Sequence, residues 1–377
     1  MILNDEQRLL KNTIEEFLAA HAPVDALRKL RDTKDELGYS TELWQQLVEM
    51  GIPLTALPES AGGLGFGWLG MGAVMQACGR NLSASPLFAS IVLGASILEA
   101  VANQSQHATL LEAVTSGELT LALALEESSH HAPSTCSTAL TQTSQGYSLQ
   151  GKKTFVLDGH SADKIIVLAR ASGDISETQG LVLVLVDKLQ AGATIKRTLL
   201  MDSRNSATIS FDNVAIGADQ VIGEVGQAWK ILTPALERGA ACMAAEMLGG
   251  CEALFDRTID YLKEREQFDV KIGSFQALQH RAALMYCELQ SLRSAVGNAL
   301  ASIDNGAEDT AKQVSLAKTL ANNCYKLISN EAVQMHGGMG VTDELDVGLF
   351  LKRARVCAQI FGDSEYHEDR YATLCGY

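Results

Sequence analysis

The spacing of apolar residues changes twice along the chain, and this double change limits the folds that the chain can adopt. From Asp5 to about Gly117, apolar side chains recur at helical spacing. From about Glu118 to Ile222 they form short runs between turn residues, and from Gln227 onward helical spacing returns. Only 6 prolines occur among 377 residues, which leaves room for long helices. The sequence therefore predicts helices, then strands, then a helical bundle.

This order predicts an α+β fold with a helical N-terminal domain (1–117), a central β domain (118–222) and a C-terminal helical bundle (223–377). Strands of this spacing without intervening helices favour a small antiparallel barrel or sandwich. The polar segment Thr141–Gly146 is expected to be a hairpin turn. The expected strands are Leu119–Leu125, Tyr147–Leu149, Thr154–Leu157, Lys164–Ala169, Leu181–Val186 and Thr208–Phe211.

Three or four long helices with short connections are expected in the C-terminal bundle. Glycine tolerates the left-handed conformation that ends a helix, so Gly337 and Gly338 are expected to end the third of them. Thr342-Asp343 is expected to cap the fourth. The expected helices are Gln227–Lys263, Ser274–Ser302, Lys312–His336 and Glu344–Gln359.

The charge and the cysteine pattern exclude several classes of protein. Thirty Lys and Arg against forty-five Asp and Glu give a net charge of −15, which argues against nucleic acid or an anionic membrane as the main partner. Eight scattered cysteines without a CxxC pair argue against a disulfide framework or a zinc site. The charged N-terminus and the lack of an 18-residue apolar stretch argue against a secretory signal and a membrane span. We expect a cytoplasmic protein.

Two local patterns carry candidate chemistry. Arg265 is expected near the end of a long helix with Phe268 one turn on, and a guanidinium beside an aromatic ring suits a phosphate or pyrophosphate. The alternative is that Arg265 pairs on a solvated face with Glu264, Glu266 or Asp269.

His130 and His131 are adjacent, so their side chains diverge on a strand, and no further ligand spacing completes a metal site.

Four motifs, in order and spread over nearly the whole chain, resemble those of the flavin-dependent acyl-CoA dehydrogenase family. The segment Tyr261–Phe268 with Phe275–His280 is similar to that family's YxxxRxQF and FQxxQH motifs. Gln334–Thr342 resembles its QxxGGxGxT turn. Pro58–Gly65 resembles its PExxGGxG loop, and Gly151–Gly159 resembles its GxKxWITN strand. The family's domain order is also helical, β and helical.

The resemblance implies an FAD site shared between subunits of a tetramer. It implies that Arg265 and Phe268 contact the FAD of a neighbouring subunit, with Gln276 helping to hold it. Contacts to the adenine-side diphosphate are implied for Gln334, Gly337 and Gly338. In the strand expected beside the flavin ring, Phe155 replaces a tryptophan and Leu157 replaces a hydroxyl residue, which leaves backbone amides to bind the ring.

The implied activity is α,β-dehydrogenation of an acyl-CoA thioester to trans-2-enoyl-CoA, with electrons passed to an electron-transfer flavoprotein. Such a reaction needs a carboxylate base. Aligning the family's YEGT motif places Phe361 at the glutamate position, and phenylalanine cannot accept a proton. Other members use a glutamate that precedes an arginine on the first bundle helix, which makes Glu237 the candidate base; Asp363 and Glu365 are weaker alternatives.

Two other functions fit the same sequence. The family's TEPxxGSD stretch corresponds to Leu125–His131, which lacks the Gly-Ser-Asp. Together with Phe361, this suggests a non-catalytic subunit that contacts FAD in a heterotetramer, as in relatives that act on steroid side-chain thioesters. A flavin oxidase of the same fold that reacts directly with oxygen is the third reading.

Overall fold

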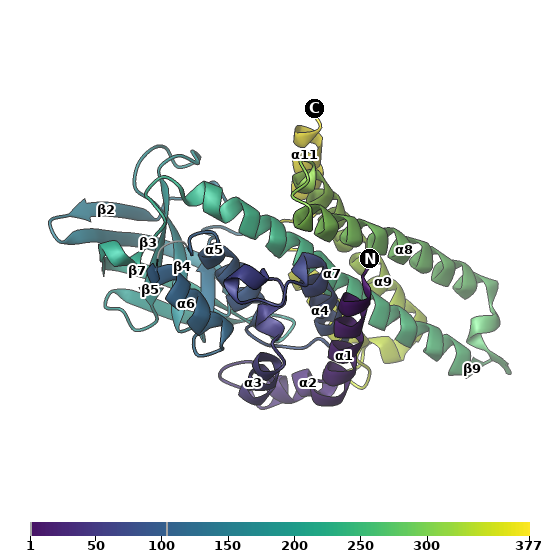
Figure 1. Cartoon of the computed structure of the whole chain (residues 1–377). Helices are drawn as coiled ribbons and strands as arrows, with labels where there is room; N and C mark the ends of the chain where they lie inside the picture. The colour runs from purple at the N-terminus through teal and green to yellow at the C-terminus, as the bar shows by residue number, and fades with distance from the viewer. Residues whose placement is uncertain (1, 103–104) are drawn as a thin grey trace. The chain divides into compact units, whose positions relative to one another are not determined.

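Segments distant in the sequence come together in two compact units. The computed structural model describes residues 2–102 and 105–377. One unit combines Met1–Asp32, Thr55–Ser83 and Ala240–Tyr377, and the other combines Thr33–Leu54 and Ala84–Gly239. The predicted order of helices, strands and helices is confirmed (Figure 1).

The first third of the chain is helical, as predicted. In α1 the Asn4 side chain accepts the amide of Gln7 at 2.7 Å, and the Gln7 side chain accepts the amide of Asn4 at 3.1 Å. This reciprocal pair satisfies two amides that helix geometry leaves without partners. The α-helices are α1 (Asp5–His21), α2 (Val24–Asp32), α3 (Thr41–Glu49), α4 (Gly67–Asn81), α5 (Ser96–Glu99) and α6 (Ser105–Thr115), and a π-helix spans Leu87–Ala95.

Helix α4 packs unusually closely against α7 (Ala228–Glu264). A Cβ placed on Gly79 of α4 would lie 1.9 Å from the carbonyl oxygen of Glu246, and one on Gly249 of α7 would lie 1.9 Å from that of Gln76. A side chain at Gly79 or Gly249 would therefore force the two helices apart.

This crossing yields a stability prediction. Replacing Gly249 by alanine drives a methyl group into the α4 backbone, so we expect a loss of about 1–3 kcal/mol in the free energy of unfolding. A matched control is Gly348→Ala on α10, where an added Cβ meets no atom within 4 Å and alanine favours the helix. Thermal unfolding of both variants checks this. Equal melting temperatures would contradict the close-packing argument.

The middle of the chain forms an eight-stranded sheet in which the strand order is β6-β7-β3-β2-β4-β5-β8, with β1 beside β4. Most neighbours are antiparallel, but β1 pairs with β4 in parallel, with Leu121 opposite Lys164. The strands are β1 (Leu121–Ala124), β2 (Ala139–Thr143), β3 (Gly146–Leu157), β4 (Lys164–Arg170), β5 (Leu181–Asp187), β6 (Ala193–Leu199), β7 (Asn205–Ile216) and β8 (Val221–Ile222).

Two details of the predicted sheet are wrong. Thr141–Thr143 belongs to β2 rather than to a turn, and it pairs with the start of β3 down to Thr143 opposite Gly146. The strand β6 was not predicted, because its side chains alternate between exposed and half-buried positions and so form no apolar run. By contrast β4 is almost wholly buried, which is why its continuous apolar sequence was recognised.

The C-terminal region is helical, as predicted, and its helices pack around α9. After α7 come α8 (Gln276–Asp304), α9 (Thr310–His336), α10 (Val347–Cys357) and α11 (Ser364–Leu374). Gly337 ends α9 with φ +57°, as glycine allows. The prediction that Thr342-Asp343 caps the fourth bundle helix, α10, is wrong, because α10 begins after Asp346. The carboxylate of Asp343 instead pairs with Nη2 of Arg31 at 2.6 Å.

Lys318 of α9 is fully buried and holds the turn after α10. Its Nζ lies within hydrogen-bonding distance of the carbonyl oxygens of Cys357 (3.1 Å) and Gly362 (3.0 Å) and of Oδ1 of Asn322 (2.8 Å). Burial lowers the pKa of Lys318 from 10.5 to about 7, although the nearby Cys357 and Asp363 act in the opposite direction.

This depressed pKa predicts a pH-dependent stability. Between pH 7 and 10.5 the unfolded chain keeps a proton on Lys318 that the folded chain has lost, so the free energy of unfolding rises with pH, by up to about 1.4 kcal/mol per unit. Lys318→Met removes this slope, whereas Lys326→Met, at an exposed site on the same helix, keeps it. Urea unfolding between pH 7 and 9.5 measures both. Identical slopes in the two variants would contradict the assignment.

None of the helices that the structure describes is both long and apolar enough to cross a membrane.

Candidate functional site

Arg265 and Phe268 lie in a hairpin that connects α7 to α8. Helix α7 ends at Glu264, and the strands β9 (Glu266–Gln267) and β10 (Val270–Lys271) follow it. The expectation that Phe268 lies one helical turn beyond Arg265 is therefore wrong. Phe268 occupies the tip of the hairpin at φ +56°, a backbone conformation that a bulky residue rarely adopts. Its side chain is 85% exposed and meets the Phe275 ring edge-on, with 6.2 Å between the ring centres.

The guanidinium of Arg265 is exposed and does not take part in the ion pairs of this hairpin. Glu266, one of its three possible partners, instead pairs with Lys271 at 2.6 Å. Within residues 2–102 and 105–377, Arg265 forms no ion pair. The structure thus favours the first interpretation of Arg265, as a cation available to an anionic ligand.

The turn at the end of α9 lies beside the end of α7. The rings of Tyr261 and His336 stack with 4.3 Å between their centres, and the Tyr261 hydroxyl donates to the His336 carbonyl oxygen at 3.5 Å. Burial lowers the pKa of His336, whose Nδ1 bonds the carbonyl oxygen of Ala332, so this side chain is a structural imidazole. Arg265 follows Tyr261 by one helical turn, and its amide donates to the Tyr261 carbonyl oxygen at 2.9 Å.

Gly337 and Gly338 leave open space above the backbone of this turn. A Cβ on either glycine would meet no atom within 4 Å, and both residues are exposed. A phosphate could therefore approach the main chain closely, as it does at other glycine turns. Gln334 and Gln276 are also exposed, at the end of α9 and the start of α8 respectively.

Ion pairs to α2 fix the chain just after this glycine turn. Arg31 binds Asp343 through Nη2 at 2.6 Å, and Arg28 binds Asp346 through Nη2 at 3.0 Å. The hydrogen bond from Arg31 is the main reason that the pKa of Asp343 is lowered to about 2. The sequence alone did not reveal these contacts, because they join residues more than 300 positions apart.

Phe155 and Leu157 lie at a distortion of β3. The register between β3 and β7 shifts between Lys153 and Val156, and Phe155 has φ +51°. Both side chains are half-buried. Strain of this kind in a strand re-aims side chains and backbone amides, and it is common beside binding sites.

A buried ion pair missed by the sequence analysis anchors this distortion. Lys153 is fully buried, and its Nζ donates to Oε1 of Glu127 at 2.8 Å and to the Leu125 carbonyl oxygen at 3.0 Å. Glu127 also accepts the amides of Ser137 at 2.8 Å and Thr138 at 2.9 Å. Burial raises the pKa of Glu127, but the charge of Lys153 and these hydrogen bonds outweigh burial. They hold the pKa of Glu127 well below its usual range.

The neighbouring carboxylate, Glu126, binds an imidazole. Nδ1 of His131 bonds Oε1 of Glu126 at 2.5 Å, and the two side chains are 5% and 16% exposed respectively. The carbonyl oxygen of Glu126 accepts the amide of Thr154 at 2.7 Å, next to the distorted Phe155. The segment that departs from the family's TEPxxGSD stretch is thus an ordered part of the same region.

Glu237 lies half-buried on α7, three residues after Pro234. Its neighbour Arg238 donates from Nη1 to Oε2 of Glu99 at 2.9 Å. Glu237 belongs to the same unit as Phe155 and Leu157. The other predicted ligands all belong to the other unit, which includes Ala240–Tyr377: Arg265, Phe268, Gln276, Gln334, Gly337 and Gly338.

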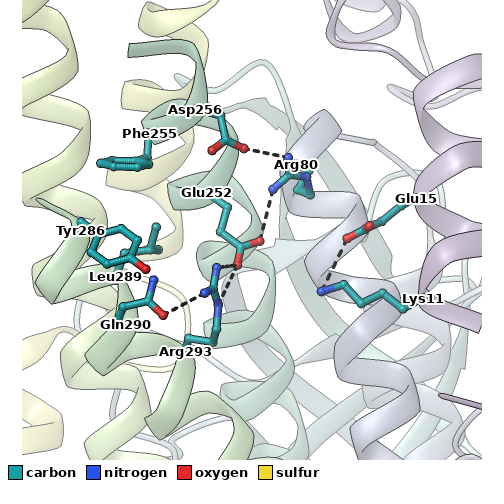
Figure 2. Close-up of a pocket in the computed structure, with 10 residues that line it drawn as sticks. All are labelled: Lys11, Glu15, Arg80, Glu252, Phe255, Asp256, Tyr286, Leu289, Gln290 and Arg293. Carbon is teal, nitrogen blue, oxygen red and sulfur yellow. Dashed lines mark hydrogen bonds and ion pairs between the residues drawn. The ribbon is translucent and has the colours of Figure 1, made fainter. Parts of the chain in front are cut away.

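The structure also contains a polar pocket of about 350 Å³ between α1, α4, α7 and α8. Figure 2 shows Arg80 and Arg293 converging on the carboxylate of Glu252, with contacts of 3.3 and 2.7 Å. Gln76 donates to the same carboxylate at 2.6 Å. None of the residues predicted to bind a cofactor lines this pocket, and its charges are paired with one another. We interpret it as a structural ion-pair network.

Comparisons with known proteins identify the family. Three models match successive parts of the chain: acyl-CoA dehydrogenase, N-terminal domain (4–118), middle domain (122–214) and C-terminal domain (226–373). The chain therefore belongs to the acyl-CoA dehydrogenase family, whose members are flavoproteins and oxidoreductases that act on CH–CH groups.

Individual relatives match over nearly their whole length. Mitochondrial isovaleryl-CoA dehydrogenase of Pongo abelii is 29% identical over 371 residues, covering 96% of this chain and 87% of the relative. The ChsE4–ChsE5 complex from Mycobacterium tuberculosis matches with a TM-score of 0.89 and 25% identity, covering 100% of this chain and 99% of that one. An FAD complex of PigA shares the fold, with a TM-score of 0.91, 23% identity and coverage of 100% and 99%.

Proposed function

We propose that this protein is an FAD-dependent acyl-CoA dehydrogenase that converts an acyl-CoA thioester to a trans-2-enoyl-CoA and passes the electrons to an electron-transfer flavoprotein. The observation that carries the proposal is the match to all three domains of the family, in a chain with an exposed Arg265 and an open glycine turn at Gly337 and Gly338. We propose domain boundaries of 1–117, 118–222 and 223–377. Its eight free thiols support a reducing, cytoplasmic setting.

The residues of the hairpin and the glycine turn fit the FAD diphosphate. Arg265 supplies a positive charge, and the backbone at Gly337 and Gly338 allows close approach of phosphate oxygens. Phe268 and Gln276 project from the surface of this chain, which suits contact with the FAD of a neighbouring subunit. Gln334 contributes a neutral hydrogen-bonding group at the same turn. These features support a tetramer in which subunits share FAD sites.

The β domain carries the proposed contacts to the flavin ring. The distorted backbone at Phe155 and Leu157 would hold the ring system through main-chain amides, since neither side chain has a hydroxyl. When bound, FAD supplies the hydride acceptor. The protein's own task is to grip the thioester, exclude water and hold the proton that leaves the carbon next to the carbonyl.

We propose that the carboxylate of Glu237 is the base that accepts this proton. Glu237 is half-buried, and its unit also carries Phe155 and Leu157. The family's other position for this base is occupied by Phe361, whose side chain is 8% exposed and cannot take a proton.

A non-catalytic subunit of a heterotetramer is the second candidate. Phe361 supports it, as does the likeness to a chain of the ChsE4–ChsE5 complex, which is built from two different proteins. Co-expression with the product of an adjacent gene and mass measurement separate the two candidates. A stable homotetramer with turnover excludes this alternative.

The FAD contact of Arg265 can be tested by binding. Removing a charged donor from a phosphate costs roughly 1.5–3 kcal/mol, so Arg265→Gln is expected to weaken FAD binding roughly 10- to 100-fold. Lys263→Gln is the matched control, because Lys263 is an exposed cation at the same helix end. Titration of the FAD-free protein, followed by flavin fluorescence, measures both. Equal affinities in the two variants would remove Arg265 from the site.

The role of Glu237 can be tested by turnover. Glu237→Gln keeps the shape but loses the base, so kcat should fall roughly 10²- to 10⁴-fold on the best substrate of a panel of straight, branched and steroid side-chain acyl-CoAs. Glu224→Gln, at an exposed site before the same helix, should keep full activity. Undiminished turnover in Glu237→Gln would show that the base lies elsewhere.

A further inference from the structure

Glu126 and Glu127 are adjacent in sequence, yet their side chains have different partners. Glu127 reaches the buried Lys153 and the amides of Ser137 and Thr138, so its role is to hold the β domain together. Glu126 bonds none of these groups, and its carboxylate contacts His131 and the amide of Ala132.

The Glu126–His131 pair lies next to the distorted part of β3. The amide of Thr154 donates to the Glu126 carbonyl oxygen at 2.7 Å, and the Thr154 hydroxyl lies 3.4 Å from the Ser128 carbonyl oxygen. Phe155, the next residue, has φ +51°, and Asp158 has φ +53°. Backbone strain and a strand irregularity therefore coincide with a largely buried carboxylate–imidazole pair.

Stability alone is a poor explanation for such a pair. Both side chains are largely removed from water, which costs free energy that the attraction between them only partly offsets. The fold already has the Lys153–Glu127 pair to fix this end of β1. Polar pairs that are kept despite this cost, beside strained backbone, are typical of binding sites.

We propose that the Glu126–His131 pair forms a polar wall of the site at Phe155 and Leu157, and that it sets the reduction potential of the flavin ring bound there. This inference rests on the proposed function. Reduction adds negative charge to the ring, so a nearby carboxylate opposes it and a hydrogen-bond partner of that carboxylate weakens this opposition. His131 is the residue whose ring bonds the carboxylate of Glu126.

Two substitutions test this, because they should shift the flavin in opposite directions. Glu126→Gln removes a negative charge and should raise the ratio of reduced to oxidised flavin at a fixed potential about tenfold. His131→Asn removes the imidazole that bonds the carboxylate and should lower that ratio. Glu118→Gln, an exposed carboxylate before β1, should leave it unchanged. Anaerobic titration against a redox dye measures the ratio, and thermal melting confirms that each variant is folded.

The possible outcomes separate a failure of the proposed function from a failure of the inference about the Glu126–His131 pair. Wild-type protein that takes up no FAD would overturn both the proposed function and this inference. Wild-type protein that binds FAD, with the same potential in Glu126→Gln, His131→Asn and the control, would overturn the inference alone. If Glu126→Gln is unfolded, His131→Asn alone carries the test, and an unchanged potential in that variant has the same meaning.

Discussion

The buried ion pair between Lys153 and Glu127 determines the local geometry of the β domain. It ties β3 to the segment after β1, and Glu127 also collects the amides of Ser137 and Thr138 before β2. Breaking such a pair leaves an uncompensated charge in the interior, so the two residues depend on each other. Glu126, the next residue back, bonds His131 instead, and its carbonyl oxygen accepts the amide of Thr154 beside the strained Phe155. The features that we propose to surround the flavin ring thus lie along the chain from this one contact.

In the other unit, helix ends determine what the surface offers to a ligand. The stacking of Tyr261 on His336 brings the end of α7 to the end of α9, and the arginines of α2 secure the chain just beyond. This unit thus presents an exposed arginine, Arg265, and a glycine turn with open backbone at Gly337 and Gly338. The lysine that is buried in this unit, Lys318, serves a different purpose, since its three hydrogen bonds hold the turn at Gly362.

Much of the fold could be predicted because periodicity is a local property. Helix α8, expected at Ser274–Ser302, lies at Gln276–Asp304, whereas the half-exposed β6 gave no apolar signal. Motifs located the candidate site residues, but not the contacts that fix them. Spacing could not decide whether Arg265 pairs with a neighbouring carboxylate, and the pairing of Lys153 with Glu127 joins positions 26 residues apart. The cap predicted at Asp343 was wrong because a distant arginine competes for that carboxylate.

The central claim is that this chain binds FAD and reduces it with an acyl-CoA. The most direct measurement is the absorbance of the FAD-loaded protein after anaerobic mixing with each member of an acyl-CoA panel. Our account predicts that at least one acyl-CoA bleaches the flavin band in proportion to the enoyl-CoA formed. A protein that retains FAD but is bleached by none of them, alone or with a partner subunit, would contradict it.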